Sequence, residues 1–545
     1  MTRRILVAVA WPYASGPLHL GHLGGAYLPP DIFARYHRLV GHDVLMVSGS
    51  DANGTPITVK AEELGITPRE VVDMYHPEIL GYWDRLGISF DLFTTTMTEN
   101  HHRVTQDFFL RLLGNGYLVK DTSEQFYDPQ AERFLPDRYV EGTCPHCGYT
   151  EARGDQCDNC GRTLDPTDLI DPRSRLSGAT PVRRETEHYF LDLPAFKEPL
   201  TEWLEAKTTW RRHVRNWALG MVADMPQRAI TRDIEWGVDL PVEDLGPGKK
   251  IYVWFDAVIG YLSAAIEWAS QTDDPDSWEH WWKDPEAESY YFVGKDNIPF
   301  HAVIWPAMLM GRGDLNLPTD VPANQYITFK GAKASKSKGV GRSIGWYADR
   351  LQPDALRYAI ASVLPEQDDT DLSDEEIIRR VNDELVATWG NLVNRVLSMS
   401  DRNFEGKVPT PRELTAIDQE IVDLGPHVLN TVADHIEKVE LRAGLRAAMD
   451  AATEVNVYLN ATEPWKALKE EPERAATVLW SAVQAIAAIR IALYPYLPHS
   501  TATIGEMLGT GPDVLSWSAP QIPGGTILGE IAPAFVKLEE DSLDS

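Results

Sequence analysis

Apolar runs in the first half of the chain predict buried parallel strands that lead into ligand-binding loops. Ile5 to Ala10 is continuously apolar, which is typical of a parallel strand covered on both faces. A second run, Val44 to Ser48, leads into Gly49, Ser50 and Asp51. We therefore expect Asp51 at the carboxyl end of a strand, where open α/β sheets hold ligands. Further strands are predicted at 251–255, 290–293 and 325–329.

From about residue 375 the pattern changes to amphipathic helices, because apolar residues recur at steps of three and four. The stripes are Ile378, Val381, Leu385, Trp389, Leu392 and Val396; Val432, Ile436 and Val439; and Val483, Ile486, Ile489 and Leu493. This pattern predicts a C-terminal helical bundle. Pro520 to Gly525 would end the bundle, and the acidic residues after it would form a loosely held tail.

Length and charge narrow the class of protein. The 545 residues exceed what one core usually organises, so we expect three or four modules. Ile5 to Trp11 is too short to span a bilayer, and we expect no later run to approach the roughly 20 residues needed, so the sequence predicts a cytoplasmic protein with no membrane partner. The net charge of −30 argues against a polyanionic partner, yet Arg211 to Arg215 and Lys330 to Lys338 are locally basic. The charge pattern is therefore compatible with a basic track for nucleic acid and equally with an acidic surface that is only solvated.

All four cysteines lie in two short turns, CPHCG and CDNCG. Each C-x-x-C turn lets two thiolates face one ion, and four thiolates fill a tetrahedral shell. We therefore expect one structural Zn²⁺ held by Cys144, Cys147, Cys157 and Cys160. Two disulfides or free thiols are the alternative, which fits poorly with a chain that shows no secretory signal.

Two further motifs carry candidate phosphate chemistry. In HLGH, His19 and His22 lie close together at a predicted helix start, where imidazoles and backbone amides can hold ATP phosphates. In KASKS, Lys333 and Lys336 could close over a triphosphate and neutralise the leaving pyrophosphate. Taken alone, the histidines of HLGH could equally be structural, and the KASKS segment could equally be an exposed loop with no ligand. Their order, about 310 residues apart with predicted strands between them, is difficult to explain by chance.

With these motifs the chain resembles the methionyl-tRNA synthetases of the class I, Rossmann-type group, from Arg4 to about Leu497. The segments that carry the resemblance are WPYASGPLHLGHL, GSDANGTPI, IYVWFDAVIGY, FVGKDNIPFHAVIWPAML, GAKASKSKG and WGNLVNR. Paired zinc knuckles in a short insertion distinguish this family from the leucyl, isoleucyl and valyl enzymes, whose insertions are larger editing domains. The resemblance implies an α/β fold: a class I Rossmann-type parallel sheet split by a zinc-binding connective insertion and followed by an all-α anticodon-binding bundle.

The resemblance also divides the chain. The expected parts are the first half of the catalytic domain (1–115), the connective insertion with the zinc knuckles (116–225), the second half of the catalytic domain (226–325), the KMSKS-loop and stem-contact region (326–374), the helical anticodon-binding domain (375–518) and the C-terminal tail (519–545). Some family members carry an extra C-terminal tRNA-binding and dimerisation domain. This chain ends about 20 residues after its Pro/Gly-rich segment, so we expect a monomer.

The activity implied by the resemblance is that of a methionine–tRNA ligase. L-methionine would attack the α-phosphate of ATP, which is accompanied by Mg²⁺, to give methionyl-adenylate and pyrophosphate. The methionyl group would then pass to the 3′-terminal adenosine of tRNA(Met), for translation initiation and elongation. His19, His22, Lys333 and Lys336 would contact the phosphates, and Gly294 and Asp296 would hold the adenosine.

The family match also indicates a methionine pocket. Asp51 would pair with the substrate ammonium, and the other predicted pocket residues are Tyr13, Trp254, Ala257, Val258, Tyr261, Asn297 and His301. Aromatic walls suit a polarizable thioether, and a tyrosine or histidine donor near the sulfur could help selection. Without the match, Trp254 and Tyr261 read equally well as core aromatics.

Three positions depart from the family pattern. Asn53 stands where histidine is common, Val258 replaces a usual proline, and Ala334 replaces the methionine of the KMSKS signature. The lysines carry the chemistry of that loop, so Ala334 is expected to matter least. Asn53 and Val258 could alter pocket shape or methionine affinity.

Three bundle residues match family positions that contact the CAU anticodon: Asn391, Arg395 and Trp465. The first two are one helical turn apart. Trp465 follows Pro464 and could instead be a hydrophobic staple, and Arg395 could be a solvated charge.

Two other functions fit parts of the sequence pattern. One is a relative that activates methionine or an analogue for another pathway, and the anticodon residues argue against it. The other is a noncatalytic tRNA-binding protein, and the retained His19, His22, Lys333 and Lys336 argue against that.

Overall fold

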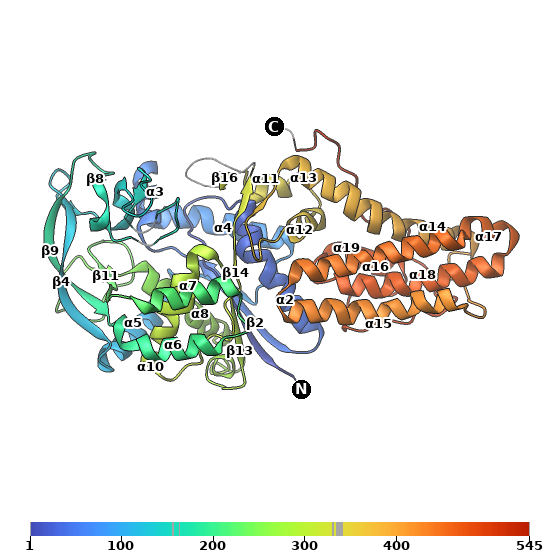
Figure 1. The fold of residues 1–545 in the computed structure, drawn as a ribbon, viewed down its shortest axis with the longest axis horizontal. Coiled ribbons are helices and arrows are strands. Elements are labelled where there is room, and N and C mark those ends of the chain that lie inside the picture. The colour runs from blue at the N-terminus through green and yellow to red at the C-terminus, as the bar shows by residue number, and fades with distance from the viewer. Residues whose placement is uncertain (1, 155–156, 163, 330–331, 334–341, 544–545) are drawn as a thin grey trace.

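The computed structural model describes residues 2–154, 157–162, 164–329, 332–333 and 342–543. These residues form an elongated molecule with three parts along its long axis (Figure 1). A parallel sheet lies in the middle, a β-rich insertion lies at one end and a bundle of long helices lies at the other.

The central sheet has five parallel strands in the order β14-β13-β1-β2-β3. Its strands are β1 (Arg4–Val9), β2 (Asp43–Ser50), β3 (Leu92–Thr95), β13 (Glu288–Gly294) and β14 (Ala323–Asn324). Residues 5–9 are all fully buried, as expected for a strand covered on both faces. The strands predicted at 5–10, 44–48 and 290–293 are confirmed. The helices around them are α2 (Leu28–Leu39), α3 (Thr55–Leu64), α4 (Pro68–Leu86), α5 (Glu99–Gly114), α8 (Val253–Ala269), α9 (Glu279–Trp282) and α10 (Trp305–Arg312).

The strand predicted at 251–255 is wrong. β12 covers only Lys250–Ile251 and pairs with β11 (Thr231–Arg232), and Val253 already begins α8. A short apolar run does not distinguish a buried strand from a buried helix, and here the apolar sequence continues through the helix to Ala269.

The segment at 325–329 is a strand only in part. β15 (Ile327–Phe329) pairs with β16 (Ala332–Lys333) and β17 (Thr370–Asp371) outside the central sheet. β14, just before this segment, is the strand that joins the sheet.

The insertion is built on a long antiparallel pair, β4 (Leu118–Asp128) and β9 (Val182–Leu191), at the left of Figure 1. The other elements of this region are β5 (Arg133–Phe134), β6 (Val140–Thr143), β7 (Ala152–Arg153), β8 (Ile170–Ser174), α6 (Lys197–Ala206), α7 (Arg212–Ala223) and β10 (Arg228–Ala229). The insertion has a small hydrophobic core of its own, to which Cys144 and Cys157 belong. Glu62 of α3 accepts from Arg133 at 2.8 Å and from the Tyr139 hydroxyl at 3.1 Å, so the insertion is tied to the helix that follows β2.

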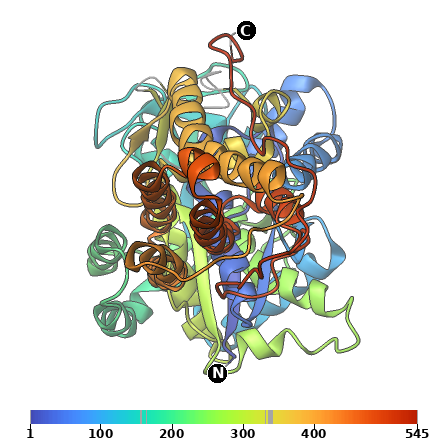
Figure 2. The same cartoon turned by 90° about the vertical axis from the view of Figure 1, so that its right-hand side faces the viewer.

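The C-terminal region is helical, as predicted, and Figure 2 looks at the bundle end-on. A short connecting region, α11 (Ile344–Ala348) and α12 (Pro353–Ala361), precedes it. The elements of the bundle are α13 (Asp374–Arg379), a π-helical segment (Arg380–Gly390), α14 (Asn391–Asn403), α15 (Ala416–Glu437), α16 (Leu441–Thr462), α17 (Pro464–Glu470), α18 (Pro472–Leu493) and α19 (Pro498–Met507). The predicted stripes are buried, apart from the half-buried Ile378.

Two expectations about the C-terminal half need correction. Among the described residues, α18 is long and apolar enough to cross a membrane, contrary to the sequence reading, but it is the buried core helix of the bundle. The tail is also held more firmly than expected: Leu543 is 1% exposed, and its carbonyl accepts from Arg342 at 2.6 Å. The Asn382 side chain exchanges two hydrogen bonds of 2.8 Å with the backbone of Leu538, because an amide can both donate and accept.

Candidate active site

The HLGH sequence forms the start of a helix, as predicted. His19 is the extended residue before α1 (Leu20–His22), which continues through a π-helical turn (Leu23–Tyr27) into α2. The backbone N–H of His19 donates to His22 Nδ1 at 3.2 Å, and the two rings lie 3.8 Å apart between centroids. Because Nδ1 of His22 accepts, a neutral ring carries its proton on Nε2. That nitrogen is therefore a donor suited to a phosphate oxygen.

The flanks of the KASKS loop lie against this helix start. Ile344 N donates to Leu18 O at 2.7 Å, and His19 forms an isolated β-bridge with Ser343. A small cavity here is lined by His19, Leu20, Gly21, Ile327, Phe329, Arg342 and Tyr347. The backbone of Lys333 lies in β16, and Lys336 lies outside the described residues. The fold thus brings the residues just after the KASKS segment beside HLGH, although the two motifs are about 310 residues apart in the sequence.

Tyr13 and Asp51 meet where β1 and β2 end. Ala14 N donates to Asp51 O at 3.0 Å, and Asp51 N donates to Pro12 O at 2.8 Å. Tyr13 contacts the Trp254 ring edge-on at 6.3 Å between centroids, and Trp254 stacks on Phe300 at 3.9 Å. Ala257 and Val258 are buried one turn further along α8. Phe300 was not predicted as a pocket residue from the sequence. Only its position inside the FVGKDNIPFH segment could have indicated that role.

Tyr261 and His301 form a buried pair. The Tyr261 hydroxyl lies 2.6 Å from His301 Nε2, and His301 Nδ1 lies 2.9 Å from the carbonyl oxygen of Asn297. Because a carbonyl only accepts, Nδ1 carries the proton and Nε2 accepts from Tyr261. Burial lowers the pKa of His301 to about 4, so the ring is neutral at pH 7. The Tyr261 hydroxyl and His301 Nδ1 thus already donate to these partners. Either group would have to give up its partner before it could donate to a thioether sulfur.

Asn53 links Asp51 to a second buried carboxylate. Its backbone N–H donates to Asp51 Oδ1 at 3.0 Å, and its side-chain amide donates to Asp256 Oδ2 at 2.6 Å. Asp51 is 3% exposed and Asp256 is fully buried. Burial, and then the nearby charge of Asp256, raise the pKa of Asp51. Sequence reasoning missed Asp256, although a carboxylate inside the apolar run of α8 was a usable signal.

Replacing Asp256 with asparagine should therefore move the acid limb of kcat/KM for methionine to lower pH. Removing a like charge lowers the pKa of Asp51, so its carboxylate persists into more acidic solution, where the pairing with a substrate ammonium predicted for Asp51 would be kept. Steady-state kinetics from pH 5 to pH 8 would measure the shift. An acid limb that stays in place or moves to higher pH would contradict the coupling.

Gly294 and Asp296 lie together at the end of β13 and in the short turn Lys295–Asn297 that follows it. The Tyr326 hydroxyl donates to Asp296 Oδ1. A Cβ added to Gly161 would lie 3.6 Å from the same oxygen. The second cysteine turn therefore borders Asp296, one of the two residues predicted to hold the adenosine.

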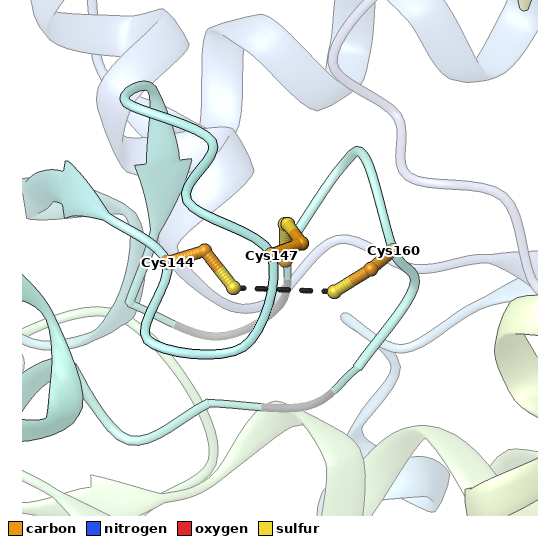
Figure 3. A group of neighbouring side chains, drawn as sticks. Cys144, Cys147 and Cys160 are labelled. Carbon is orange, nitrogen blue, oxygen red and sulfur yellow. Dashed lines mark hydrogen bonds between the residues drawn. The ribbon is translucent and has the colours of Figure 1, made fainter.

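The four cysteine sulfurs lie within 4.8 Å of one another. Sγ of Cys144 is 3.9 Å from that of Cys160 (Figure 3), and Sγ of Cys147 is 3.6 Å from that of Cys157. Zinc–thiolate bonds of about 2.3 Å in a tetrahedron place sulfurs about 3.8 Å apart, whereas a disulfide needs about 2.05 Å. The cluster can therefore bind a metal ion, and its geometry disfavours the disulfide alternative.

The glycines after each pair adopt positive φ, +74° at Gly148 and +70° at Gly161. This conformation lets Gly148 N donate to Cys144 O at 3.0 Å and Gly161 N donate to Cys157 O at 2.8 Å. The two turns are therefore closed in the same way by their own backbone.

The three anticodon candidates lie on the bundle. The Arg395 guanidinium carbon is 5.7 Å from the centroid of the Trp465 ring, and Arg395 Nη2 donates to Asn456 at 2.9 Å. Trp465 is 37% exposed, and Asn391 is exposed at the start of α14. α17, which carries Trp465, lies at the end of the bundle away from the sheet (Figure 1).

The basic cluster at 211–215 is largely structural. Arg211 donates to the carbonyl of Ala323 at 3.0 Å, and Arg215 donates to that of Leu204 at 2.9 Å. These guanidinium groups hold the backbone and are therefore weaker candidates for a nucleic-acid track than the sequence suggested.

A parallel sheet whose first strand leads into HLGH, with the residues that follow KASKS beside that helix start and an insertion that holds four clustered cysteines, defines a class I aminoacyl-tRNA synthetase. Residues 5–397 match the family model "tRNA synthetases class I (M)", and residues 408–542 match the "Anticodon binding domain of methionyl tRNA ligase". The chain belongs to the methionyl-tRNA synthetase family.

Its relatives agree with this placement. It is 49% identical to the methionine–tRNA ligase of Roseiflexus castenholzii, over 99% of this chain and 97% of that one. It is 48% identical to that of Corynebacterium jeikeium, over 99% and 91%. The structure resembles Mycobacterium tuberculosis methionyl-tRNA synthetase bound by methionyl-adenylate, with a TM-score of 0.81, 26% identity, and coverage of 98% and 100%.

Proposed function

We propose that this site ligates L-methionine to tRNA(Met) in two steps. A methionine carboxylate oxygen attacks the α-phosphorus of ATP, and the bond to the β-phosphate breaks to release pyrophosphate. A ribose hydroxyl of the 3′-terminal adenosine then attacks the acyl carbon and releases AMP. The observation that carries this proposal is the hydrogen-bonded contact between the HLGH helix start and the residues that flank the KASKS loop.

Within this reaction the residues divide the work by position. Asp51 pairs with the substrate ammonium, and the thioether side chain takes the aromatic pocket around Tyr13 and Trp254. His19 and His22 stabilise charge that develops on the phosphates, and Lys333 and Lys336 neutralise the departing pyrophosphate. Gly294 and Asp296 hold the adenosine. Mg²⁺ bound to ATP supplies further charge neutralisation.

The metal of the cysteine cluster is proposed to be a single structural Zn²⁺. Four thiolates leave no open coordination position, so the ion fastens the insertion and does no chemistry. The enzyme is further proposed to act as a cytoplasmic monomer without a membrane partner.

The test is ATP–pyrophosphate exchange with zinc-loaded protein, run with each standard amino acid and with homocysteine. Exchange that depends on methionine supports the first step and leads to tRNA charging assays. Exchange with a different amino acid would mean that Asn53 and Val258 have changed the specificity. No exchange with any amino acid would favour a noncatalytic tRNA-binding protein.

Replacing Trp465 with alanine should weaken charging of tRNA(Met) and leave pyrophosphate exchange unchanged. An exposed aromatic that stacks on one base contributes about 1–3 kcal/mol, roughly 5- to 150-fold in kcat/KM for tRNA. Trp217→Ala is the matched control, because Trp217 is 42% exposed on α7, outside the bundle. Equal losses in both variants would argue against a specific anticodon contact.

A further inference from the structure

The helix that begins at the two histidines is tied to the bundle through Gly24. The Gly24 carbonyl, in the π-helical turn after His22, accepts from Asn324 Nδ2 at 3.1 Å. Asn324 is 1% exposed, and its Oδ1 accepts from Arg211 Nη1 at 2.5 Å. Arg211 Nη2 donates in turn to the carbonyl of Val439, just beyond α15, at 3.2 Å. An unbroken polar chain thus runs from the histidine helix to the bundle.

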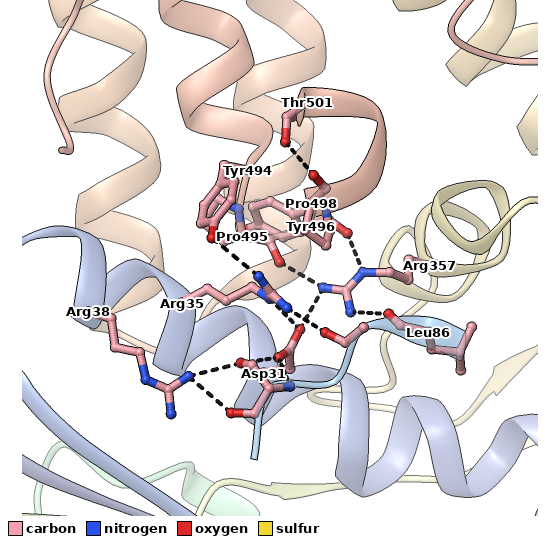
Figure 4. Close-up of polar contacts among 12 residues, drawn as sticks. Asp31, Arg35, Arg38, Leu86, Arg357, Tyr494, Pro495, Tyr496, Pro498 and Thr501 are labelled. Atoms are coloured by element: carbon pink, nitrogen blue, oxygen red, sulfur yellow. Dashed lines mark hydrogen bonds and ion pairs between the residues drawn. The ribbon is translucent and has the colours of Figure 1, made fainter. Parts of the chain in front are cut away.

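A second chain of hydrogen bonds begins at Asp31, about two turns beyond Gly24 along the same helix (Figure 4). Arg357 Nη2 donates to Asp31 Oδ2 at 2.7 Å, and both side chains are fully buried. The same guanidinium donates to the carbonyls of Tyr496 at 2.7 Å and Pro495 at 2.9 Å, where α18 gives way to α19. It also donates to the carbonyl of Leu86 at the end of α4, at 3.1 Å.

These contacts leave the helix little freedom. The second oxygen of Asp31 accepts from the Ser89 backbone at 2.8 Å and from its hydroxyl at 2.7 Å. Burial opposes the charge of Asp31, but Arg35 and Arg357 outweigh it and hold the pKa at about 2, so the ion pair persists at working pH. At Gly24 an added Cβ would lie 2.4 Å from Ile327 Cδ1. A satisfied buried network of this kind specifies one arrangement.

We propose that Asn324 and Arg357 are positioning residues for adenylation: they fix the helix that carries His19 and His22 against backbone carbonyls of the bundle. The placement of the phosphate-binding histidines then depends on how the bundle is docked. This inference rests on the proposed function of those histidines. Asn324 and Arg357 are not among the residues proposed to touch the reacting atoms, but a displacement of about 1 Å at a reacting centre is enough to lower a rate about a hundredfold.

Two substitutions test the two ends of these hydrogen-bonded chains separately, one at the histidine helix and one at the bundle. Asn324→Asp keeps an acceptor for Arg211 but loses the donor to Gly24, so it releases the histidine helix and spares the bundle. Arg357→Lys keeps a cation near Asp31 but cannot reach both bundle carbonyls, so it releases the bundle and spares the helix. Asn316→Asp is the matched control, because Asn316 Nδ2 donates to the carbonyl of Asp284 at 2.6 Å, apart from both chains.

Pyrophosphate exchange in the full chain gives the readout. We expect both variants to lower kcat at least about tenfold, to keep the KM for methionine within about twofold, and to leave Asn316→Asp at wild-type rate. In a His22→Ala background these losses should shrink, because the variants act through the histidine helix. Should Arg357→Lys not fold, as judged by thermal unfolding, Arg211→Lys tests the bundle side under the same criteria.

Three results would overturn the proposal. One is an unchanged kcat in a folded variant of either hydrogen-bonded chain, and another is a rise in the KM for methionine in place of a fall in kcat. The third is a loss of activity in a variant that adds in full to the loss caused by His22→Ala. The proposed function is judged separately, by the wild-type chain. Wild-type protein without methionine-dependent exchange would remove that function, whereas an active wild type with unaffected variants would remove only the positioning inference.

Discussion

Replacing His22 with alanine is expected to lower methionine-dependent pyrophosphate exchange by about 10²- to 10³-fold, the usual cost of losing one preorganised donor to developing charge. The reason is local geometry. His22 Nδ1 accepts from the backbone N–H of His19, so Nε2 carries the proton of the neutral ring and is the donor of this side chain. The fall should appear in kcat, because the proposed methionine contacts come from Asp51 and the aromatic pocket and not from His22.

The control for this substitution is His280→Ala, which removes an exposed imidazole from α9. Its exchange rate should equal that of the wild type. If His22→Ala raised the KM for methionine and left kcat unchanged, the phosphate role assigned to the HLGH helix would be wrong.

Replacing Cys157 with serine is expected to release the metal, to destabilise the insertion and to raise the KM for ATP at least about tenfold. Structural zinc sites contribute about 10–16 kcal/mol of apparent binding free energy in small peptides, and Cys157 is part of the insertion's own core. The effect should reach ATP because the turn containing Gly161 lies against Asp296. Metal content, thermal unfolding and ATP kinetics would measure the three effects.

Asn159→Ala is the matched variant for this experiment. It removes a hydrogen bond of 3.6 Å to the sulfur of Cys147 without removing a ligand, so metal content and ATP kinetics should stay near wild type. A Cys157→Ser protein that keeps both its metal and its ATP affinity would show that the cysteine cluster does not support the nucleotide site.

Much of the site could be predicted from the sequence because it depends on local chain geometry. Two residues between paired cysteines, followed by glycine, produce a turn that faces two sulfurs toward one point, and both turns do so here. HLGH after a strand and a Gly-Pro break likewise places two imidazoles at a helix start. The end of β2 places Asp51 at the edge of the sheet.

The residues that sequence reasoning missed act across long separations. Asp256 reaches Asn53 over 203 positions and Asn324 reaches Gly24 over 300, and no periodicity reports such pairs. The strand predicted at 251–255 failed for a related reason, since an apolar run is compatible with any buried element and only its packing partners decide which.

The sequence by itself therefore determined the elements whose geometry is set within a few residues: the cysteine turns, the start of the histidine helix, the buried strands and the helical stripes. The tertiary structure alone decided which of them meet. Backbone contacts between distant segments placed the KASKS flank beside HLGH, and the docking of the bundle brought the carbonyl of Tyr496 to Arg357. Local sterics and hydrogen bonds act along neighbouring residues, whereas contacts between distant segments follow from how complete elements pack around a shared core.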